Sequence, residues 1–449
     1  MKKTLFINTI LLLIGVISFF ACNSCGGDGD TNGAKIKPIN TKVDINKIKI
    51  NVYIENSGSM NGYINASNSE FKQCIGSLLT DLPYTFNKDS IEVFYINEQI
   101  YKQADGNKLN DFINNISNKT FNVGKTTSSN INKIFGMILE KTNKNTISIL
   151  YSDFIYSIDG KSQNQILDLL NGAKYSTKSA FMQYSKNNKS NLFTSFYRYM
   201  SIFNGTYYNW MNGKEKINNH RPYYICVIGE KHIVSELNKK IDFDKYSGYT
   251  NNYTLSNSTF DDIYYSVLLN TNNTNGFKPI RKDRNNTGNY TRSIELGKRS
   301  RRNQSNKLQL SIIVDLSSIP LDKEYLNNLQ NYYVNSDFRL DKIELYNKNK
   351  IHPSDNRMIN TARINPTHVL TFSSVSNNFQ YLEFGLKNNI KNWISKYSNE
   401  DDVNTKNDRK KLDQTFGISF LIGGIYDAYY QINNKNEYYF KNKITIKKD

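Results

Sequence analysis

Cysteine and histidine are scarce in this sequence, with four of each among 449 residues. Four cysteines are too few for the dense disulfide framework of small secreted domains. Cys74 and Cys226 lie in apolar contexts, where we expect two buried free thiols, with a disulfide between them as the alternative. The histidines lack the spacing of metal ligands, and no G-x-S-x-G, P-loop or H-E-x-x-H motif occurs. These absences disfavour the hydrolases, nucleotide-binding proteins and zinc proteases that carry those motifs.

The N-terminus has the pattern of an export signal. Lys2 and Lys3 precede a nearly uninterrupted apolar run over residues 5–20, which is short for a membrane-spanning helix. The run ends in Phe-Phe-Ala-Cys, which resembles a bacterial lipobox and implies cleavage after residue 21 and lipidation of Cys22. A simple membrane anchor or an ordinary secretory signal is the alternative. Residues 22–44 predict a flexible tether, because residues 23–33 are Gly, Asp, Asn, Ser and Thr apart from one cysteine. We therefore expect a lipid-anchored protein of the bacterial cell envelope, on the inner or the outer membrane.

The net charge of +18 invites a nucleic-acid interpretation. The sequence is rich in Lys, Asn, Ile and Tyr throughout, so its charge is spread evenly instead of forming one basic face. The one dense basic stretch, residues 281–302, is flanked by Asn and Gly and predicts a solvated loop. We therefore expect no nucleic-acid partner.

Residues 45–242 alternate between strand and helix patterns. Apolar runs predict strands at 47–54, 90–96, 146–151 and 221–230, and apolar residues at helical spacing predict helices at 69–82, 108–116, 130–141, 163–173 and 232–240. The aromatic-rich segments 191–199 and 207–210 flank an Asn-Gly turn and suggest a hairpin or an insert. This rhythm predicts an α/β domain with a doubly wound, mostly parallel sheet and helices on both faces.

Residues 243–449 have a different texture. Short strands are separated by polar turns, which predicts a β-rich, antiparallel, sandwich-like domain with some helix. The expected strands are 262–269, 308–316, 338–346, 368–372, 379–386 and 437–446, and the expected helices are 390–397 and 413–430.

Polar residues follow the apolar strands of the first domain at three places. Glu55, Ser57 and Ser59 end the first strand, residues 126–129 form a Thr- and Ser-rich loop before a helix, and Asp153 follows the strand at 146–151. In an open α/β sheet, ligands bind beyond the carboxyl ends of the strands. Converging hydroxyl and carboxylate oxygens are hard ligands that suit a magnesium-like cation.

These three segments resemble the von Willebrand factor A domain over roughly residues 45–240. The family carries D-x-S-x-S, a threonine in a loop before a helix, and an aspartate in a T-D-G context. The resemblance implies an exposed metal-ion-dependent adhesion site for Mg²⁺ or Mn²⁺, in which the serines and the threonine bind the cation and the acids act largely through water. Carried over, Ser57 and Ser59 are direct ligands, and Glu55 and Asp153 are the acidic members. Thr127 is preferred for the third hydroxyl, with Ser129 as the alternative. Glu55 replaces the family's first aspartate, and Phe154 its glycine.

The resemblance implies a binding module and not an enzyme. Its cation would grip a carboxylate of a protein or another anionic partner, while the C-terminal domain presents or docks it. One alternative is a scaffold subunit of an envelope assembly that needs no metal. The other is a hydrolase using Ser57 or Ser59, which the sequence disfavours because no histidine or lysine is expected beside either serine.

Overall fold

The computed structural model describes most of the chain from residue 43 to residue 447. The described residues are 43–127, 129–158, 160, 162–188, 191–260, 263–271, 278–286, 288–297, 307–319, 321–376 and 378–447. They belong to one compact unit spanning residues 40–449. The lipobox, Cys22 and the tether up to residue 42 lie outside the described residues. Within the described residues, no helix has both the length and the apolar character needed to cross a membrane.

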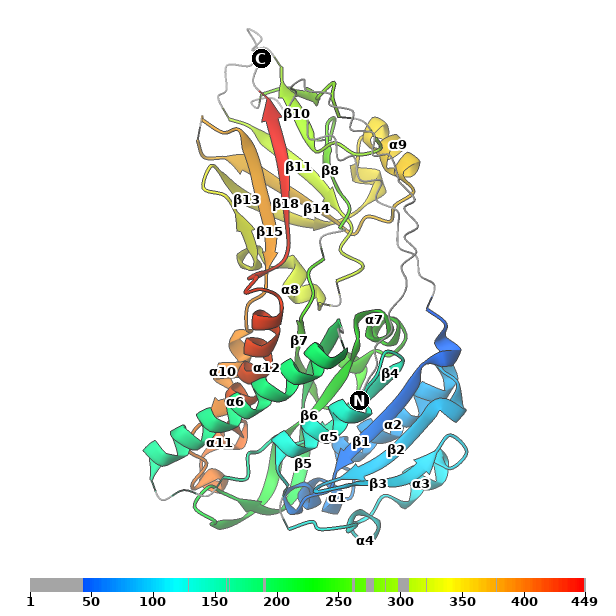
Figure 1. Ribbon diagram of the computed structural model, residues 1–449, viewed down its shortest axis with the longest axis vertical. Coiled ribbons are helices and arrows are strands. Elements are labelled where there is room, and N and C mark those ends of the chain that lie inside the picture. The colour runs from blue at the N-terminus through cyan, green and yellow to red at the C-terminus, as the bar shows by residue number, and fades with distance from the viewer. Residues whose placement is uncertain are drawn as a thin grey trace, which may run out of the picture. The chain divides into compact units, whose positions relative to one another are not determined.

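A seven-stranded mixed sheet forms the first part of the protein, with strand order β3-β2-β1-β4-β6-β5-β7 (Figure 1). Its strands are β1 (Lys49–Glu55), β2 (Ile91–Ile96), β3 (Ile100–Asp105), β4 (Thr146–Ser152), β5 (Leu192–Tyr208), β6 (Lys214–Glu230) and β7 (Tyr249–Ser256). The central strand β1 pairs in parallel with β2 and β4, as predicted. All other pairings are antiparallel, so the prediction of a mostly parallel sheet is wrong.

A long hairpin is the physical reason for the antiparallel half. The turn between β5 and β6 is closed by Asn209, whose Oδ1 accepts hydrogen bonds from the backbone N–H groups of Met211 at 3.1 Å and Gly213 at 2.9 Å. Asn212 takes a positive φ of 59° within this turn. Strands joined by so short a connection must run antiparallel. The apolar segment 221–230, expected as the strand of a final βα unit, is therefore the second arm of a hairpin.

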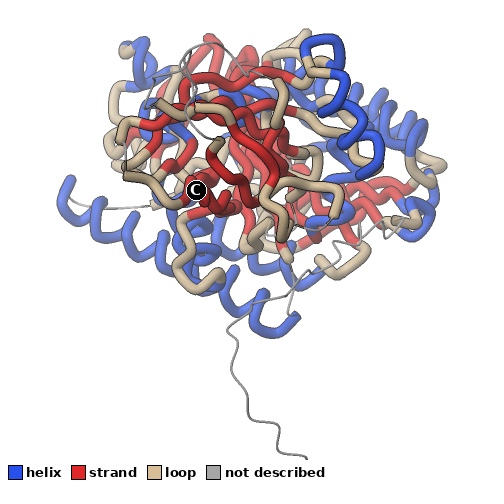
Figure 2. The backbone as a smooth tube through the Cα atoms, turned by 90° about the horizontal axis from the view of Figure 1, so that it is seen from above, coloured by secondary structure: helices blue, strands red, loops and turns tan. Residues whose placement is uncertain are grey.

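Helices cover both faces of this sheet, as predicted (Figures 1 and 2). α2 (Glu70–Thr85) and α7 (Lys231–Lys240) pack on one face, and α5 (Ile131–Lys141), α6 (Gln163–Asn188) and α12 (Ile418–Ile432) on the other. α2 begins where the Ser69 side chain accepts a hydrogen bond from the backbone N–H of Lys72, a typical N-cap. The shorter helices α1 (Asn61–Asn65), α3 (Leu109–Asn115) and α4 (Asn118–Phe121) lie in the first third of the chain.

Two further sheets form the β-rich part. One has the order β13-β14-β11-β8 and is antiparallel, and the other has the order β12-β15-β18-β10-β9, in which only β10 and β18 are parallel. The sheets pack against each other through Phe372 and Phe384, whose ring centroids are 5.3 Å apart. The strands are β8 (Tyr265–Leu268), β9 (Ile280–Lys282), β10 (Ser293–Leu296), β11 (Gln309–Val314), β12 (Tyr332–Val334), β13 (Phe338–Leu345), β14 (His368–Ser374), β15 (Tyr381–Lys387) and β18 (Tyr438–Lys447).

A late segment of the chain returns to the seven-stranded sheet. It contains α10 (Asn392–Lys396), β16 (Ser398–Asn399), α11 (Arg409–Leu412), β17 (Thr415–Phe416) and α12. Two further helices, α8 (Lys323–Asn327) and α9 (Pro353–Ala362), belong to the β-rich part. Arg198 of β5 is 1% exposed and donates to Asp413 Oδ1 at 2.5 Å. Asp402 accepts a hydrogen bond from the hydroxyl of Tyr207 at 2.6 Å. Residues 402 and 413 thus contact β5 of the seven-stranded sheet, to which β7 also belongs.

Candidate metal centre

Two parallel strand ends place the first carboxylate of the candidate site. Glu55 is the last residue of β1 and Ser152 the last residue of the neighbouring β4. The register pairs Ile54 with Tyr151, so the next residues along, Glu55 and Ser152, lie side by side. The Ser152 hydroxyl donates to Glu55 Oε2. The carboxyl edge of the sheet therefore begins with a buried carboxylate and a hydroxyl.

Hydroxyl groups from three segments of the chain donate hydrogen bonds to the Glu55 carboxylate. Ser57 Oγ donates to Glu55 Oε1 at 2.7 Å, and Ser129 Oγ donates to the same oxygen. Ser59 Oγ lies 3.1 Å from Ser57 Oγ. A serine hydroxyl has one proton and two lone pairs, so a serine that gives its proton to Glu55 keeps its lone pairs for another partner. The arrangement thus holds hydroxyl oxygens in place with lone pairs free for an electrophile.

Asp153 supplies the second carboxyl group of the site. It is 2% exposed, and its Oδ1 accepts a hydrogen bond from the backbone N–H of Ile155 at 3.2 Å. Burial and the nearby Glu55 carboxylate raise the pKa of Asp153 to about 7, although the Ser59 hydroxyl, the Ile155 N–H and the Arg221 charge oppose the shift. A negative charge on both of these buried, neighbouring carboxyl groups at once is energetically unfavourable. Either a proton or a cation relieves that repulsion.

Phe154 stands where the von Willebrand A pattern has glycine, and its backbone is unusual. Its φ is 51°, in the left-handed region that a bulky residue rarely adopts. The conformation is held by the Ser152 hydroxyl, which accepts a hydrogen bond from the Phe154 N–H at 2.8 Å, and by a ring stacked on Phe135 with centroids 5.8 Å apart. This position therefore has the backbone that normally calls for glycine, and burial of the ring offsets the strain.

A buried arginine adds a positive charge next to the site. Arg221 of β6 is 1% exposed, lies over the ring of Tyr207 with 4.5 Å to its centroid, and donates to the backbone carbonyls of Lys411 at 2.9 Å and Leu412 at 3.2 Å. Its charge lowers the pKa of Asp153. The sequence did not indicate this residue, because its place near the site depends on the antiparallel pairing of β6 with β4, which the predicted parallel sheet did not include.

The structure brings together five of the six predicted site residues: Glu55, Ser57, Ser59, Ser129 and Asp153. Thr127 is exposed, and no hydrogen bond joins its side chain to the described members of this group. Its loop is nevertheless adjacent, because Gly58 N–H donates to the Thr126 carbonyl at 2.8 Å.

Burial of the site differs from the sequence-based expectation. Glu55, Ser57 and Asp153 are 2%, 3% and 2% exposed, so the expectation of an exposed site is wrong for these three side chains. Ser59 is partly exposed. The reason is that Glu55 ends the buried part of β1 and Asp153 directly follows the fully buried β4, while Ser57 and Ser129 from the adjoining loops bond to Glu55. Ser152 was also missed, although its position directly before Asp153 was the available signal.

The donor set fits a hard cation better than a soft one. Hydroxyl and carboxylate oxygens are the ligands that Mg²⁺ and Mn²⁺ prefer. Among the described residues, no group of three or more His, Cys, Asp or Glu side chains is arranged to hold a metal. A cation at this edge would therefore depend on serine oxygens as well as on Asp153 and Glu55. Cys74 and Cys226 are buried free thiols, as predicted.

Comparison with known proteins does not assign this chain to a family. No protein-family model matches it, and no curated protein sequence matches it. The functional interpretation therefore depends on the residues and contacts of the site itself.

Proposed function

We propose that this protein is a cell-envelope lipoprotein whose first part is a von Willebrand A-like binding domain. In this proposal the Glu55–Asp153 site holds Mg²⁺ or Mn²⁺, and the cation binds a carboxylate of a protein or another anionic partner. The observation that carries the proposal is the convergence of Ser57, Ser129 and Ser152 on the Glu55 carboxylate. Hydroxyls oriented in this way present lone pairs to a cation.

Two features of the fold support the resemblance. The parallel strands β2, β1 and β4 end at one edge, where open α/β sheets bind ligands. The left-handed backbone of Phe154 occurs where the family pattern has glycine. Ser57, Ser59 and Ser129 would supply hydroxyl ligands, and Asp153 and Glu55 would balance the charge. When bound, the cation would supply a concentrated positive charge for a partner's carboxylate.

An enzymatic role has less support. A serine nucleophile needs a neighbouring base, and among the described residues no histidine or lysine side chain hydrogen-bonds to Ser57, Ser59 or Ser129. The scaffold alternative shares this fold and differs in needing no cation. Dependence on a divalent cation therefore separates the binding proposal from the scaffold proposal.

We expect a carboxylate to occupy the free position of a bound cation. With Mn²⁺ present, the purified protein should relax the protons of acetate more strongly than free Mn²⁺ does, because a slowly tumbling protein holds the acetate next to the paramagnetic ion. Ser57→Ala should lose this enhancement, and Ser176→Ala, a change of an exposed serine on α6, should keep it. If the wild-type protein does not enhance the relaxation of acetate, the proposed carboxylate position on the cation is wrong and the scaffold proposal is favoured.

The membrane attachment is a separate part of the proposal. We expect Cys22→Ala to move the protein from the membrane fraction to the soluble fraction, since the lipid on this cysteine would be its anchor. Cys25→Ala is the matched control and should remain with the membrane. Membrane retention and lipid labelling of Cys22→Ala would show that the lipobox interpretation is wrong.

A further inference from the structure

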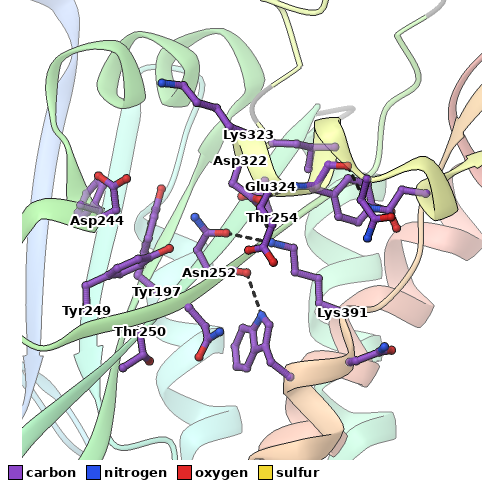
Figure 3. A pocket seen from close by; sticks show the side chains of 18 of the residues that line it. Tyr197, Asp244, Tyr249, Thr250, Asn252, Thr254, Asp322, Lys323, Glu324 and Lys391 are labelled. Atoms are coloured by element: carbon purple, nitrogen blue, oxygen red, sulfur yellow. Dashed lines mark hydrogen bonds and ion pairs between the residues drawn. The ribbon is translucent and has the colours of Figure 1, made fainter. Parts of the chain in front are cut away.

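A cavity lies beside β7, the edge strand of the seven-stranded sheet, three positions along the sheet from β4 (Figure 3). Its volume is about 810 Å³, within the usual range of small-molecule sites, roughly 300–1,000 Å³. It is lined by residues of β7, residues 241–244 after α7, residues within 321–331 around α8 and residues 389–393 at the start of α10, together with Tyr197 of β5 and Asn238 of α7. None of the proposed cation ligands belongs to this lining.

The wall of this cavity is held in place by specific bonds. Lys391 Nζ forms an ion pair with Asp322 and donates to Asn252 Oδ1 at 3.2 Å. Trp393 Nε1 donates to the backbone carbonyl of Asn252 at 2.9 Å, so an edge-strand acceptor of β7 is occupied. The side chains of Lys391 and Asp322 are only 14% and 16% exposed. These bonds fix the wall of the cavity, and one backbone acceptor of β7 is already occupied.

The lining is polar, with aromatic rings among the polar groups. Figure 3 shows Tyr197, Tyr249 and Asp244 on one side and Asp322, Glu324 and Lys391 across from them. Within the described part of the chain, Asp244 and Glu324 make no hydrogen bond or ion pair through their carboxylates. The carboxamides of the lining are Asn238, Asn251, Asn252, Asn328, Gln330, Asn331, Asn389 and Asn392.

This chemistry narrows the ligand class. Asp322, Asp244 and Glu324 all line the cavity, and their charges add to the effect of burial, which raises the pKa of the Tyr249 hydroxyl. An anion would be repelled there. An apolar ligand would leave the carboxylates of Asp244 and Glu324 without hydrogen-bond partners, which is costly.

A metal ion also fits poorly, because among the described residues no three His, Cys, Asp or Glu side chains are arranged to hold one. Lys391 neutralises Asp322 and Lys245 forms an ion pair with Asp242, so Asp244 and Glu324 are the acids of the described lining that lack an ion pair. The remaining class is a neutral molecule with many hydroxyl groups. Such a ligand donates to the free carboxylates, exchanges hydrogen bonds with the amides and packs its C–H face on an aromatic ring.

We infer that this cavity is a saccharide-binding site. In this inference Asp244 and Glu324 accept hydrogen bonds from sugar hydroxyls, Asn251 both donates and accepts, and the ring of Tyr249 supports the sugar face. The inference is independent of the proposed cation site, since the two share no residue.

Tryptophan fluorescence provides the test, because Trp393 lines the cavity and the chain has only two tryptophans. In a Trp210→Phe background, Trp393 is the sole reporter. We expect saturable fluorescence change with at least one oligosaccharide from a panel of glucose, mannose, galactose and N-acetylglucosamine hexamers. Spermidine, tested in parallel, should cause no change. Absence of a response to the whole panel, or a response to spermidine alone, would overturn the inference.

Variants localise the response to the cavity. Asp244→Asn and Tyr249→Ala should each weaken binding roughly tenfold, the effect of losing about 1.4 kcal/mol of contact energy. The matched controls Asp111→Asn and Tyr175→Ala change exposed residues outside the lining and should bind normally. Ser57→Ala should also bind the sugar normally, so failure of the cation proposal would not affect this result. Unchanged affinity in Asp244→Asn, whose side chain differs only in charge and donors, would contradict the assignment.

Discussion

In the presence of a chelator, the protein should lose stability as the pH rises from about 4 to about 7. The folded protein holds a proton on Asp153 up to a pKa of about 7, whereas the unfolded chain releases it near the ordinary value of 3.8. Stability from this group is therefore complete below the unfolded pKa and is lost as the pH rises through the folded one. At 1.36 kcal/mol per pKa unit, the loss is on the order of 4 kcal/mol.

Urea unfolding at several pH values measures this effect, and Asp153→Asn isolates it. The variant keeps the shape of the side chain but cannot titrate, so its stability should change less between pH 4 and 7 than that of the wild type. Asp402, whose pKa is also raised by burial, contributes equally to both proteins. Glu55→Gln should flatten the profile too, because it removes a charge that raises the pKa of Asp153. Parallel profiles for wild type and Asp153→Asn would contradict the assignment.

Glu55→Ala should lower the free energy of unfolding by about 2–4 kcal/mol. Three serine hydroxyls lose their common acceptor in this variant, and each bond to a charged group contributes roughly 1.5–3 kcal/mol. Relief of the repulsion with Asp153 and of the burial of a charge offsets part of this loss.

Glu92→Ala is the matched control, since Glu92 lies on the neighbouring β2 and forms ion pairs with Lys49 and Lys102 at the surface. We expect a change of under about 1 kcal/mol there, because exposed ion pairs contribute little. Chemical denaturation of both variants at pH 7 gives the comparison. A Glu55→Ala protein as stable as Glu92→Ala would show that the carboxylate does not hold the serine loops together.

The sequence was sufficient for the parallel core of the fold. The strand at 47–54 is a dense apolar run ending at Glu55, and the helices near 69–82 and 130–141 repeat apolar residues at helical spacing. The hairpin was predicted with its turn in the wrong place, because Asn204-Gly205, a typical turn sequence, lies inside β5 and the chain turns after Asn209. α6 extends to Asn188, whereas the predicted helix ended at residue 173. The added turns are mostly polar, so they lack the apolar spacing that predicts a helix.

The candidate site was predictable where residues follow one another in the chain. Glu55, Ser57 and Ser59 form a local motif, and Asp153 ends an apolar strand. The choice between Thr127 and Ser129 needed the three-dimensional path of the loop, which brings Ser129 to Glu55. Arg221 required knowledge of strand pairing across the hairpin. Local motifs were therefore readable from the sequence, whereas contacts set by strand order were not.

Calorimetric titration of the purified protein with Mn²⁺ tests the cation site most directly. We predict that one Mn²⁺ binds per chain, that binding weakens as the pH falls below about 7 because protons compete for Asp153, and that Ser57→Ala abolishes it while Ser176→Ala does not. Absence of binding to the wild-type protein at pH 8, or equal binding by Ser57→Ala, would contradict the account.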